Sequence, residues 1–331
     1  MEVLVLNGEE VTRLLPMSEC IQVMRDALTA LARGEALVPL RMIMRVPGAS
    51  GFVGLMPGYI APDERRDGAL GLKAVLVFPA NAERGIETHQ GAVLLFEADT
   101  GRLSAMMDGA AITAIRTAAV SGVATDLLAR PDSVELAILG AGVQARTHID
   151  AIAAVRPLRR VRIWSRNPDR AAALALEQRS RFNFPIEAEA MADAAVRGAD
   201  IVATVTASAE PILQRGWLKE GVHINAVGSS IPTSREIDTP TMAAARLFVD
   251  RRESALAEAG DLLIPMLEGA VRNDHVQAEL GEVLTGKNPG RRSPRELTLF
   301  KSLGLAVEDV ASAAYVVRRA RETHTGQTVK M

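Results

Sequence analysis

The sequence predicts an α/β fold, in which a doubly wound parallel sheet is joined to a discontinuous α+β domain. Three observations lead to this prediction. An apolar run, Val134 to Leu139, ends at two closely spaced glycines and is followed by residues with helical spacing. Strand-like and helical segments then alternate as far as about residue 249, which is typical of βαβ units. Before residue 97, short β segments follow one another directly, and this favours antiparallel pairing.

The composition is that of a globular protein long enough for two domains. The chain has 331 residues, of which 48% are hydrophobic and 24% charged, with a net charge of -2. Without a basic block and with only 3% aromatic residues, neither nucleic acid nor a membrane is an expected partner. We also expect no signal peptide and no apolar run long enough to span a bilayer. Cys20 is the only cysteine, so the sequence fits the reducing cytoplasm.

The first third of the chain is predicted to contain two helices and several strands. Met1 to Leu6 has strand character, and Asn7-Gly8 begins a helix with acidic residues in its first turn. Ser18 is the expected cap of a second helix, which ends at Gly34. Antiparallel strands are expected between residues 39 and 96, and a long helix rich in Ala and Thr over residues 106–129.

The second part is predicted to be a nucleotide-binding domain over residues 126–304, and the rest, 1–125 with 305–331, a second domain. One or two helices expected over residues 297–323 return to the N-terminal part. The expected parallel strands are Val134–Leu139, Arg160–Trp164, Ile201–Thr206, Val222–Val227 and Leu247–Val249.

A glycine pattern follows the first of these strands. Gly140 and Gly142, with Ala145 three residues on, match G-x-G-x-x-G/A at the start of a predicted helix. In a Rossmann-type fold these positions make the tight turn, let the backbone approach a pyrophosphate, and keep the helix close to its strand. The unpaired N–H groups of the helix then face the phosphates. We therefore predict a dinucleotide site.

The residues after the second predicted parallel strand, Arg160–Trp164, indicate which dinucleotide is bound. NAD-binding folds usually end this strand in Asp or Glu, whereas here Ser165 and Arg166 follow it. An arginine attracts a 2′-phosphate that a carboxylate would repel. The sequence favours NADP over NAD, with use of both cofactors left open.

Three cationic residues lie in apolar or β segments: Arg41, Lys73 and Arg116. A buried unpaired ammonium is costly, so Lys73 must reach solvent, pair with an acid or face a pocket. Arg116 has small neighbours that would let a ligand come close. A cluster of such residues beside a nicotinamide would suit a small substrate with a carboxylate.

The segment from His89 to Thr125, HQGAVLLFEADTGRLSAMMDGAAITAIRTAAVSGVAT, resembles the hallmark of the ornithine cyclodeaminase/mu-crystallin family. The resemblance continues through GLKAVLVFPAN, GAGVQA, INAVGSSIPTSREID and TLFKSLGLAVEDVASA, and so covers essentially the whole chain. It implies a homodimer whose contacts come from the discontinuous domain, with an active site between that domain and the nucleotide domain.

The resemblance also implies roles for individual residues. Lys73 matches the active-site lysine, and Arg41 and Arg116 match arginines that bind the substrate carboxylate. Residues matching the cofactor site are Arg116, Thr117, Gly140, Gly142, Val143, Gln144, Ser165, Arg166, Val227 and Gly228. The five histidines and one cysteine have no metal-ligand spacing, so no metal is expected. His148 is predicted to face solvent, and Lys301 to be structural.

One departure separates the branches of the family. Cyclodeaminases and the related alanine dehydrogenase carry an aspartate where this chain has Ser230. Serine is a poor base at neutral pH, so the sequence favours the mu-crystallin or ketimine reductase branch. We expect NAD(P)H-dependent reduction of a small α-imino acid, cyclic or acyclic, to an L-amino acid. An ammonia-dependent amino acid dehydrogenase is the alternative, ornithine cyclodeaminase is less favoured, and a small-ligand binding protein is the non-enzymatic alternative.

Overall fold

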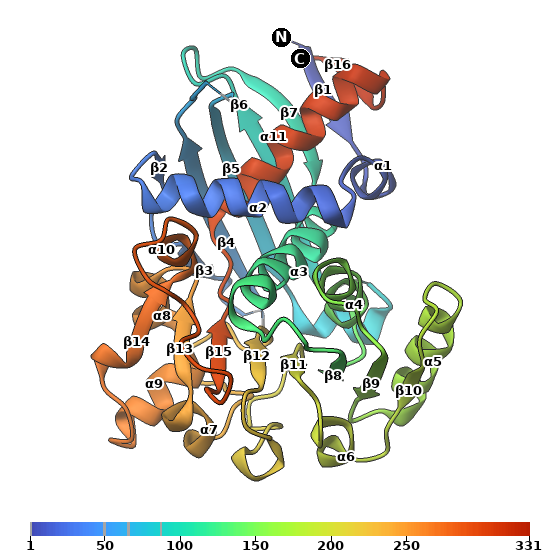
Figure 1. Cartoon of the computed structure of the whole chain (residues 1–331). Coiled ribbons are helices and arrows are strands. Elements are labelled where there is room, and N and C mark those ends of the chain that lie inside the picture. Colours follow the sequence, from blue (N-terminus) through green and yellow to red (C-terminus); the bar gives the residue numbers. More distant parts are fainter. Residues whose placement is uncertain (1, 49–50, 65–66, 87) are drawn as a thin grey trace. The chain divides into compact units, whose positions relative to one another are not determined.

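The computed structural model describes residues 2–48, 51–64, 67–86 and 88–331. The chain divides into two compact units, which are described separately: unit 1 is Met1–Arg116 with Gly304–Met331, and unit 2 is Thr117–Leu303. Helix α3 (Gly109–Leu128) continues from one unit into the other (Figure 1). Among the described residues, each unit contains one eight-stranded sheet.

Unit 1 is an α+β unit in which the strands of the sheet are mostly antiparallel. The order is β16-β1-β7-β6-β5-β4-β2, and β3 also pairs with β4. Its strands are β1 (Glu2–Leu6), β2 (Ala36–Leu37), β3 (Met42–Arg45), β4 (Phe52–Ile60), β5 (Ala69–Val77), β6 (His89–Phe96), β7 (Leu103–Asp108) and β16 (Gln327–Lys330). Its helices are α1 (Gly8–Leu14), α2 (Met17–Ala32), the 3-10 helix η1 (Pro79–Arg84) and α11 (Ala306–Thr323).

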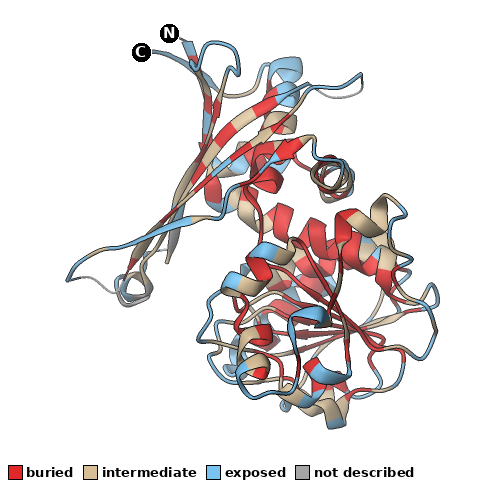
Figure 2. Ribbon diagram, turned by 90° about the vertical axis from the view of Figure 1, so that its left-hand side faces the viewer, coloured by how far each residue is buried: buried red, intermediate tan, exposed pale blue. Residues whose placement is uncertain are grey.

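Helix α11 packs against α2 and against strands β4, β5 and β6. Along strands of this sheet, buried residues alternate with less buried ones, as the burial colours of Figure 2 show. Gly58 and Gly71 permit this close packing, since a Cβ at Gly58 would lie 3.2 Å from Ala306 and one at Gly71 would lie 2.8 Å from Val310. The residues of β4 and β5 that face α11 are therefore part of the core of unit 1.

The two N-terminal helices begin differently from one another. Helix α1 begins after Asn7, as the sequence predicts, and Asn7 caps it in a capping box with Glu10, which was not predicted from the sequence. The prediction for α2 was wrong, because Pro16 is the N-cap and Ser18 lies inside the helix. Proline has no N–H to satisfy and a fixed φ suited to a helix start, so the helix begins two residues earlier than predicted.

The long helix also begins later than predicted. Met106 to Asp108 belong to β7, which pairs with β6 on one side and with β1 on the other. Two rows of backbone hydrogen bonds outweigh the helical propensity of these residues. The carboxylate of Asp108 then accepts a 2.6 Å hydrogen bond from the N–H of Ala111, so it caps the helix that follows.

Unit 2 contains a parallel sheet with the order β10-β9-β8-β11-β12-β15-β13-β14. The strands are β8 (Glu135–Leu139), β9 (Arg160–Trp164), β10 (Ile186–Ala188), β11 (Ile201–Thr204), β12 (His223–Ala226), β13 (Arg246–Val249), β14 (Val276–Glu279) and β15 (Thr298–Lys301). The helices are α4 (Val143–Val155), α5 (Pro168–Arg179), α6 (Ala192–Val196), α7 (Thr239–Ala244), α8 (Arg252–Glu258), α9 (Gly260–Leu267) and α10 (Leu280–Leu284), with 3-10 helices η2 (Arg215–Trp217) and η3 (Asn273–His275).

Both faces of this sheet are covered, as the doubly wound prediction requires. Leu136 and Ile138 of β8 belong to one buried apolar cluster, and Ala137 and Leu139 to another. Because successive side chains of a strand point to opposite faces, the two clusters are the two faces of the sheet. The α/β class with a Rossmann-type sheet is thus confirmed.

The prediction of helices throughout residues 297–323 was wrong for Thr298–Lys301. These residues form β15, which is inserted between β12 and β13. A fully buried strand of four residues shows neither the alternation of a half-buried strand nor helical spacing. Only the neighbouring strands identify it.

Helix α3 is long and apolar enough to cross a membrane, contrary to the expectation that no segment would be. However, 72% of its most apolar window is buried within the protein. A buried helix of this kind is ordinary for the core of a globular fold.

Candidate functional site

The glycine loop lies at the carboxyl edge of the sheet in unit 2. Gly140 follows β8 with φ +132, and a Cβ there would lie 2.8 Å from the backbone oxygen of Val205. Gly140 is therefore required by the turn itself. A Cβ at Gly142, by contrast, would meet no described atom within 4 Å, so open space surrounds that position.

Helix α4 begins directly after this loop. Gly142 is its N-cap and has no side chain to accept hydrogen bonds from the first turn. Gly142 and Val143 are exposed and Gln144 is half-buried, whereas Ala145 is fully buried against the sheet. The first turn thus presents backbone N–H groups of the kind that bind anions.

The residues beyond the second strand lie at the same edge. Ser165 is half-buried and Arg166 is exposed, and Asn167 caps α5 by accepting from two backbone N–H groups. No carboxylate follows β9 at this tip. The charge next to the tip is therefore positive.

Val227 and Gly228 follow β12, two strands from the glycine loop. Register places Leu139, Thr204 and Ala226 side by side at the ends of β8, β11 and β12. Val227 and Gly228 are half-buried, and Ser230 is exposed. The predicted cofactor residues of unit 2, including Thr117 on α3, thus lie in the unit that carries the glycine loop.

His148 was predicted to face solvent, and this was wrong. It is fully buried, with Nδ1 2.7 Å from the carbonyl of Gln144 and Nε2 2.9 Å from the hydroxyl of Ser121. Burial lowers the pKa of His148 to about 4, so the ring is neutral at physiological pH. It joins the first turn of α4 to α3.

Two of the three predicted cations, Lys73 and Arg116, share one buried carboxylate in unit 1. Lys73 Nζ lies 2.9 Å from Asp309 Oδ1, and Arg116 Nε lies 2.9 Å from the same oxygen. Arg116 also donates to Glu308 at 2.8 Å. Both acids belong to the first turn of α11 and are fully buried. Sequence reasoning missed them because two acids at a helix start are common for electrostatic reasons alone.

Gly304 brings the third cation to this cluster. Its carbonyl accepts a 3.0 Å hydrogen bond from Arg41. Its φ is +77, and a Cβ there would lie 2.4 Å from a terminal nitrogen of Arg116. A residue without a side chain is therefore needed where the two arginines meet. We call Arg41, Lys73, Arg116, Glu308 and Asp309 the cation cluster.

The electrostatics of the cation cluster follow from its burial. Desolvation lowers the pKa of Lys73 to about 8, because the attraction of Asp309 only partly offsets it and Arg116 and Arg41 act in the same direction as burial. Burial opposes ionisation of Asp309 as well, but the charges of Arg116 and Lys73 outweigh this and lower its pKa. The buried cations Lys73 and Arg116 and the half-buried Arg41 thus lie near one another, and groups of this kind bind carboxylates.

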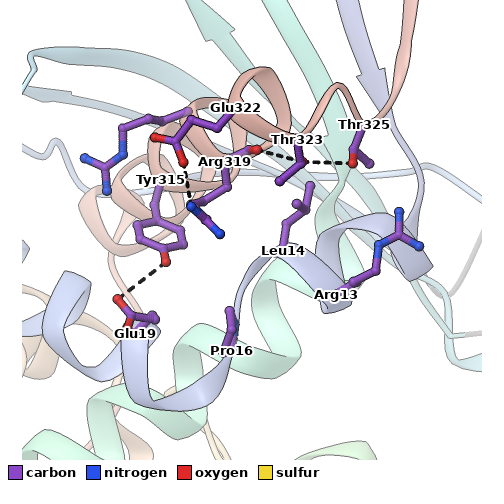
Figure 3. Close-up of a pocket in the computed structure, with 10 residues that line it drawn as sticks. Arg13, Leu14, Pro16, Glu19, Tyr315, Arg319, Glu322, Thr323 and Thr325 are labelled. Carbon is purple, nitrogen blue, oxygen red and sulfur yellow. Dashed lines mark hydrogen bonds and ion pairs between the residues drawn. The ribbon is translucent and has the colours of Figure 1, made fainter.

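A surface pocket of about 630 Å³ lies elsewhere in unit 1, between the first two helices and α11 (Figure 3). Its lining includes Tyr315, which contacts Glu19, and Arg319, which pairs with Glu322. None of its lining residues belongs to the cation cluster. In the part of the chain that the structure describes, no group of three His, Cys, Asp or Glu side chains could hold a metal ion.

Comparison with known proteins gives the affiliation of the chain. The profile of the ornithine cyclodeaminase/mu-crystallin family matches residues 1–324. Ketimine reductase mu-crystallin of Mus musculus is 41% identical over 315 residues, covering 94% of this chain and 95% of that protein.

Two solved structures are also similar over the full length. One is the Thermococcus litoralis Delta(1)-pyrroline-2-carboxylate reductase in complex with NADH and L-proline, with 39% identity and a TM-score of 0.95 over 99% of this chain and 100% of that one. The other is an archaeal alanine dehydrogenase dimer with bound NAD, with 30% identity and a TM-score of 0.94 over 100% of both chains. With its parallel sheet, glycine loop and cation cluster, this chain belongs to the ornithine cyclodeaminase/mu-crystallin family.

Proposed function

We propose that this chain is a nicotinamide-dependent reductase that converts a small α-imino acid to an L-amino acid. The observation that carries the proposal is the cation cluster, in which Arg41, Lys73 and Arg116 gather as a group able to bind one carboxylate. The relatives include a ketimine reductase and a pyrroline-2-carboxylate reductase. In this proposal, unit 2 is the dinucleotide domain, predicted over residues 126–304, and unit 1 is the substrate domain.

Each cation has a distinct part in the proposed reaction. Arg41 and Arg116 hold the substrate carboxylate, since guanidinium groups bind carboxylates in a fixed, often bidentate geometry. A bound dihydronicotinamide supplies the hydride that the imine carbon receives. Lys73, with a pKa of about 8, donates the proton that the imine nitrogen keeps, because an acid of this strength is half-ionised near working pH. Orientation of the substrate by these fixed charges supplies the rest of the acceleration.

The residues of unit 2 fit a dinucleotide. Gly140, Gly142, Val143 and Gln144 would hold the pyrophosphate, with Arg116 and Thr117 nearby and Val227 and Gly228 beside the nicotinamide. The open space at Gly142 and the uncapped first turn of α4 support this assignment. We further propose that NADPH is preferred to NADH, because Ser165 and Arg166 offer a hydroxyl and a positive charge where an acid would repel the 2′-phosphate.

The proposed test measures loss of NADH or NADPH absorbance with a panel of cyclic and acyclic α-imino acids, with and without ammonia. Consumption of a preformed imine without ammonia supports the reductase. Activity only with a keto acid and ammonia would instead support the dehydrogenase alternative, which the alanine dehydrogenase neighbour favours. Binding of the cofactor without turnover of any substrate would support the non-enzymatic alternative, a small-ligand binding protein. Formation of proline from ornithine would support the cyclodeaminase, which Ser230 disfavours.

We also propose that two copies of the chain associate through unit 1. Helices α2 and α11 cover one face of its sheet, while the edge strand β3 exposes all four of its residues. Met42 and Met44 are 64% and 59% exposed, and Met106 of β7 is 39% exposed. Such apolar exposure is characteristic of an interface, and one neighbour is described as a dimer. Light scattering of the wild type and of Met44→Lys tests this, the variant being expected to dissociate.

A further inference from the structure

A buried carboxylate joins the ends of two strands in unit 2. Glu236 is fully buried, and its Oε1 accepts hydrogen bonds from the backbone N–H of Thr206 at 2.7 Å and from the Thr206 hydroxyl at 2.6 Å. Its Oε2 accepts from the backbone N–H of Gly228 at 2.8 Å. Thr206 follows β11 and Gly228 follows β12. One side chain therefore fixes both loops.

A second carboxylate holds Glu236 itself in place. Oδ1 of Asp261, in the first turn of α9, accepts from the backbone N–H groups of Glu236 and Ile237 at 2.8 and 2.9 Å. Its Oδ2 lies 2.9 Å from Lys301 Nζ, and both side chains are fully buried. Lys301 also donates to the carbonyl of Ser229. The turn after β12 is therefore held at two adjacent residues, by Glu236 at the N–H of Gly228 and by Lys301 at the carbonyl of Ser229.

The hydrogen-bonding pattern requires Glu236 to act as an acceptor. Three donors point at its two oxygens, which suits the carboxylate form. Burial and the nearby Asp261 raise the pKa of Glu236, and Thr206 and Lys301 oppose that rise. Burying the Glu236 carboxylate is costly. It lies beside the loops that follow β11 and β12, where its oxygens accept the backbone hydrogen bonds of those loops.

The loops that contain Thr206 and Gly228 lie on the opposite half of the sheet from the loop that contains Ser165 and Arg166. In strand order, β9 and β10 lie on one side of β8, and β11, β12 and β15 lie on the other. A dinucleotide binds across the point where this order reverses, with one mononucleotide on each half. Ser165 and Arg166 follow β9, whereas Thr206 and Gly228 follow the strands of the opposite half. Gly228 has no room for a side chain, because a Cβ would lie 2.0 Å from the Thr206 carbonyl and 2.6 Å from Glu236.

We infer that Glu236 is the positioning residue for the nicotinamide half of the cofactor, acting through the backbone of Thr206 and Gly228, with Asp261 and Lys301 fixing its place. The inference rests on the proposed function only in taking the ligand to be a nicotinamide dinucleotide. Lys301 thereby has more than the structural role expected from the sequence. Glu236 does not touch the reacting atoms in this scheme.

The test compares binding of NADH with binding of ADP-ribose, which lacks the nicotinamide, in the full chain without any imine. Glu236→Gln keeps the size of the side chain but turns one acceptor oxygen into an amide that faces an N–H donor. We expect its Kd for NADH to rise about tenfold while its Kd for ADP-ribose stays within about twofold of the wild type. Fluorescence titration measures both.

Asp200→Asn is the matched control. Asp200 is also buried and accepts from two backbone N–H groups, those of Val134 and Glu135, but at the amino edge of the same sheet. Asp200→Asn should lower thermal stability without changing the ratio of the Kd for NADH to the Kd for ADP-ribose. Thr206→Val serves if Glu236→Gln does not fold. It removes the hydroxyl that donates to Glu236 and accepts from the backbone N–H of Ser208, and the expected rise in the Kd for NADH is about threefold.

Equal weakening of NADH and ADP-ribose in Glu236→Gln, or unchanged binding of both, would overturn the inference. If the wild type binds NADH but reduces no imine, the proposed reaction fails while the inference stands on the binding ratio. A wild type that binds neither nucleotide would overturn both.

Discussion

Lys73 and Asp309 form a buried ion pair with 2.9 Å between Nζ and Oδ1, although 236 residues separate them in the sequence. The same oxygen of Asp309 accepts from Arg116. One carboxylate thus fixes the spacing of two cations that come from a strand and a helix. The spacing is set by the folded unit and not by the flexibility of two long side chains, which is the condition for holding a small substrate accurately.

Replacing Lys73 by Met is expected to lower kcat for imine reduction by about 100-fold or more, because the proton donor is lost. The Kd for NADH should stay near the wild-type value. Steady-state kinetics and fluorescence titration measure the two quantities. Lys330→Met, at an exposed lysine of β16 in the same unit, is the control and should behave as the wild type. Wild-type kcat in Lys73→Met would remove Lys73 from the proposed mechanism.

The rate of imine reduction should fall as pH rises through about 8, where Lys73 loses its proton. Asp309→Asn removes the charge that favours protonated Lys73, so the falling limb should move to lower pH. A limb that stays in place would be assigned to the substrate and not to Lys73. The pH profile of kcat in both proteins decides this.

The same group has an opposite effect on stability. Its pKa is about 8 in the folded chain and 10.5 ordinarily, so the unfolded chain binds more protons between these values. The contribution of Lys73 to the free energy of unfolding therefore increases as pH rises through this window. Urea unfolding of the wild type and Lys73→Met at pH 8 and pH 10 should show a smaller pH-dependent gain in the variant.

Gly304→Ala should raise the KM for the imine about tenfold or more, because the new Cβ would lie 2.4 Å from Arg116 and displace its guanidinium. The control is Gly34→Ala, in the same unit, whose φ of +76 is almost the same but whose Cβ would meet no described atom within 4 Å. Both variants should lose about 1–2 kcal/mol of stability from backbone strain. An equal effect of the two on KM would show that the collision with Arg116 is unimportant.

Arg166→Ala is expected to raise the KM for NADPH about tenfold and to leave that for NADH nearly unchanged, because only NADPH carries the 2′-phosphate. Arg170→Ala, at an exposed arginine of α5, is the control for a general loss of positive charge. If Arg166→Ala changes the two KM values in parallel, the proposed preference for NADPH is wrong.

Local signals in the sequence were sufficient for many elements. The first helix begins after Asn7 with acidic residues in its first turn, and the strand, glycine turn and helix around Gly140 have the predicted order. These features depend on residues a few positions apart. Lys73 of the cation cluster was also recognisable from the sequence, because a lysine inside an apolar strand would be costly to bury without a partner.

Other features could not be read from neighbouring residues. His148 has the sequence surroundings of an exposed helix position but is buried against Ser121. Met106 to Asp108 join β7 because β6 and β1 pair with them, and β15 exists because β12 and β13 flank it. In each case the deciding partner lies far away in the chain.

By itself, the sequence determined the α/β class, the glycine loop between strand and helix, the family and the three cations, because each depends on short-range spacing or on side-chain chemistry. Only the tertiary structure decided that Asp309 and Glu308 pair with Lys73 and Arg116, that Gly304 lies against both Arg41 and Arg116, and that Glu236 joins Thr206 to Gly228. The physical reason is that a buried charge is tolerated only where the fold brings its partner, and the position of that partner depends on packing between distant segments.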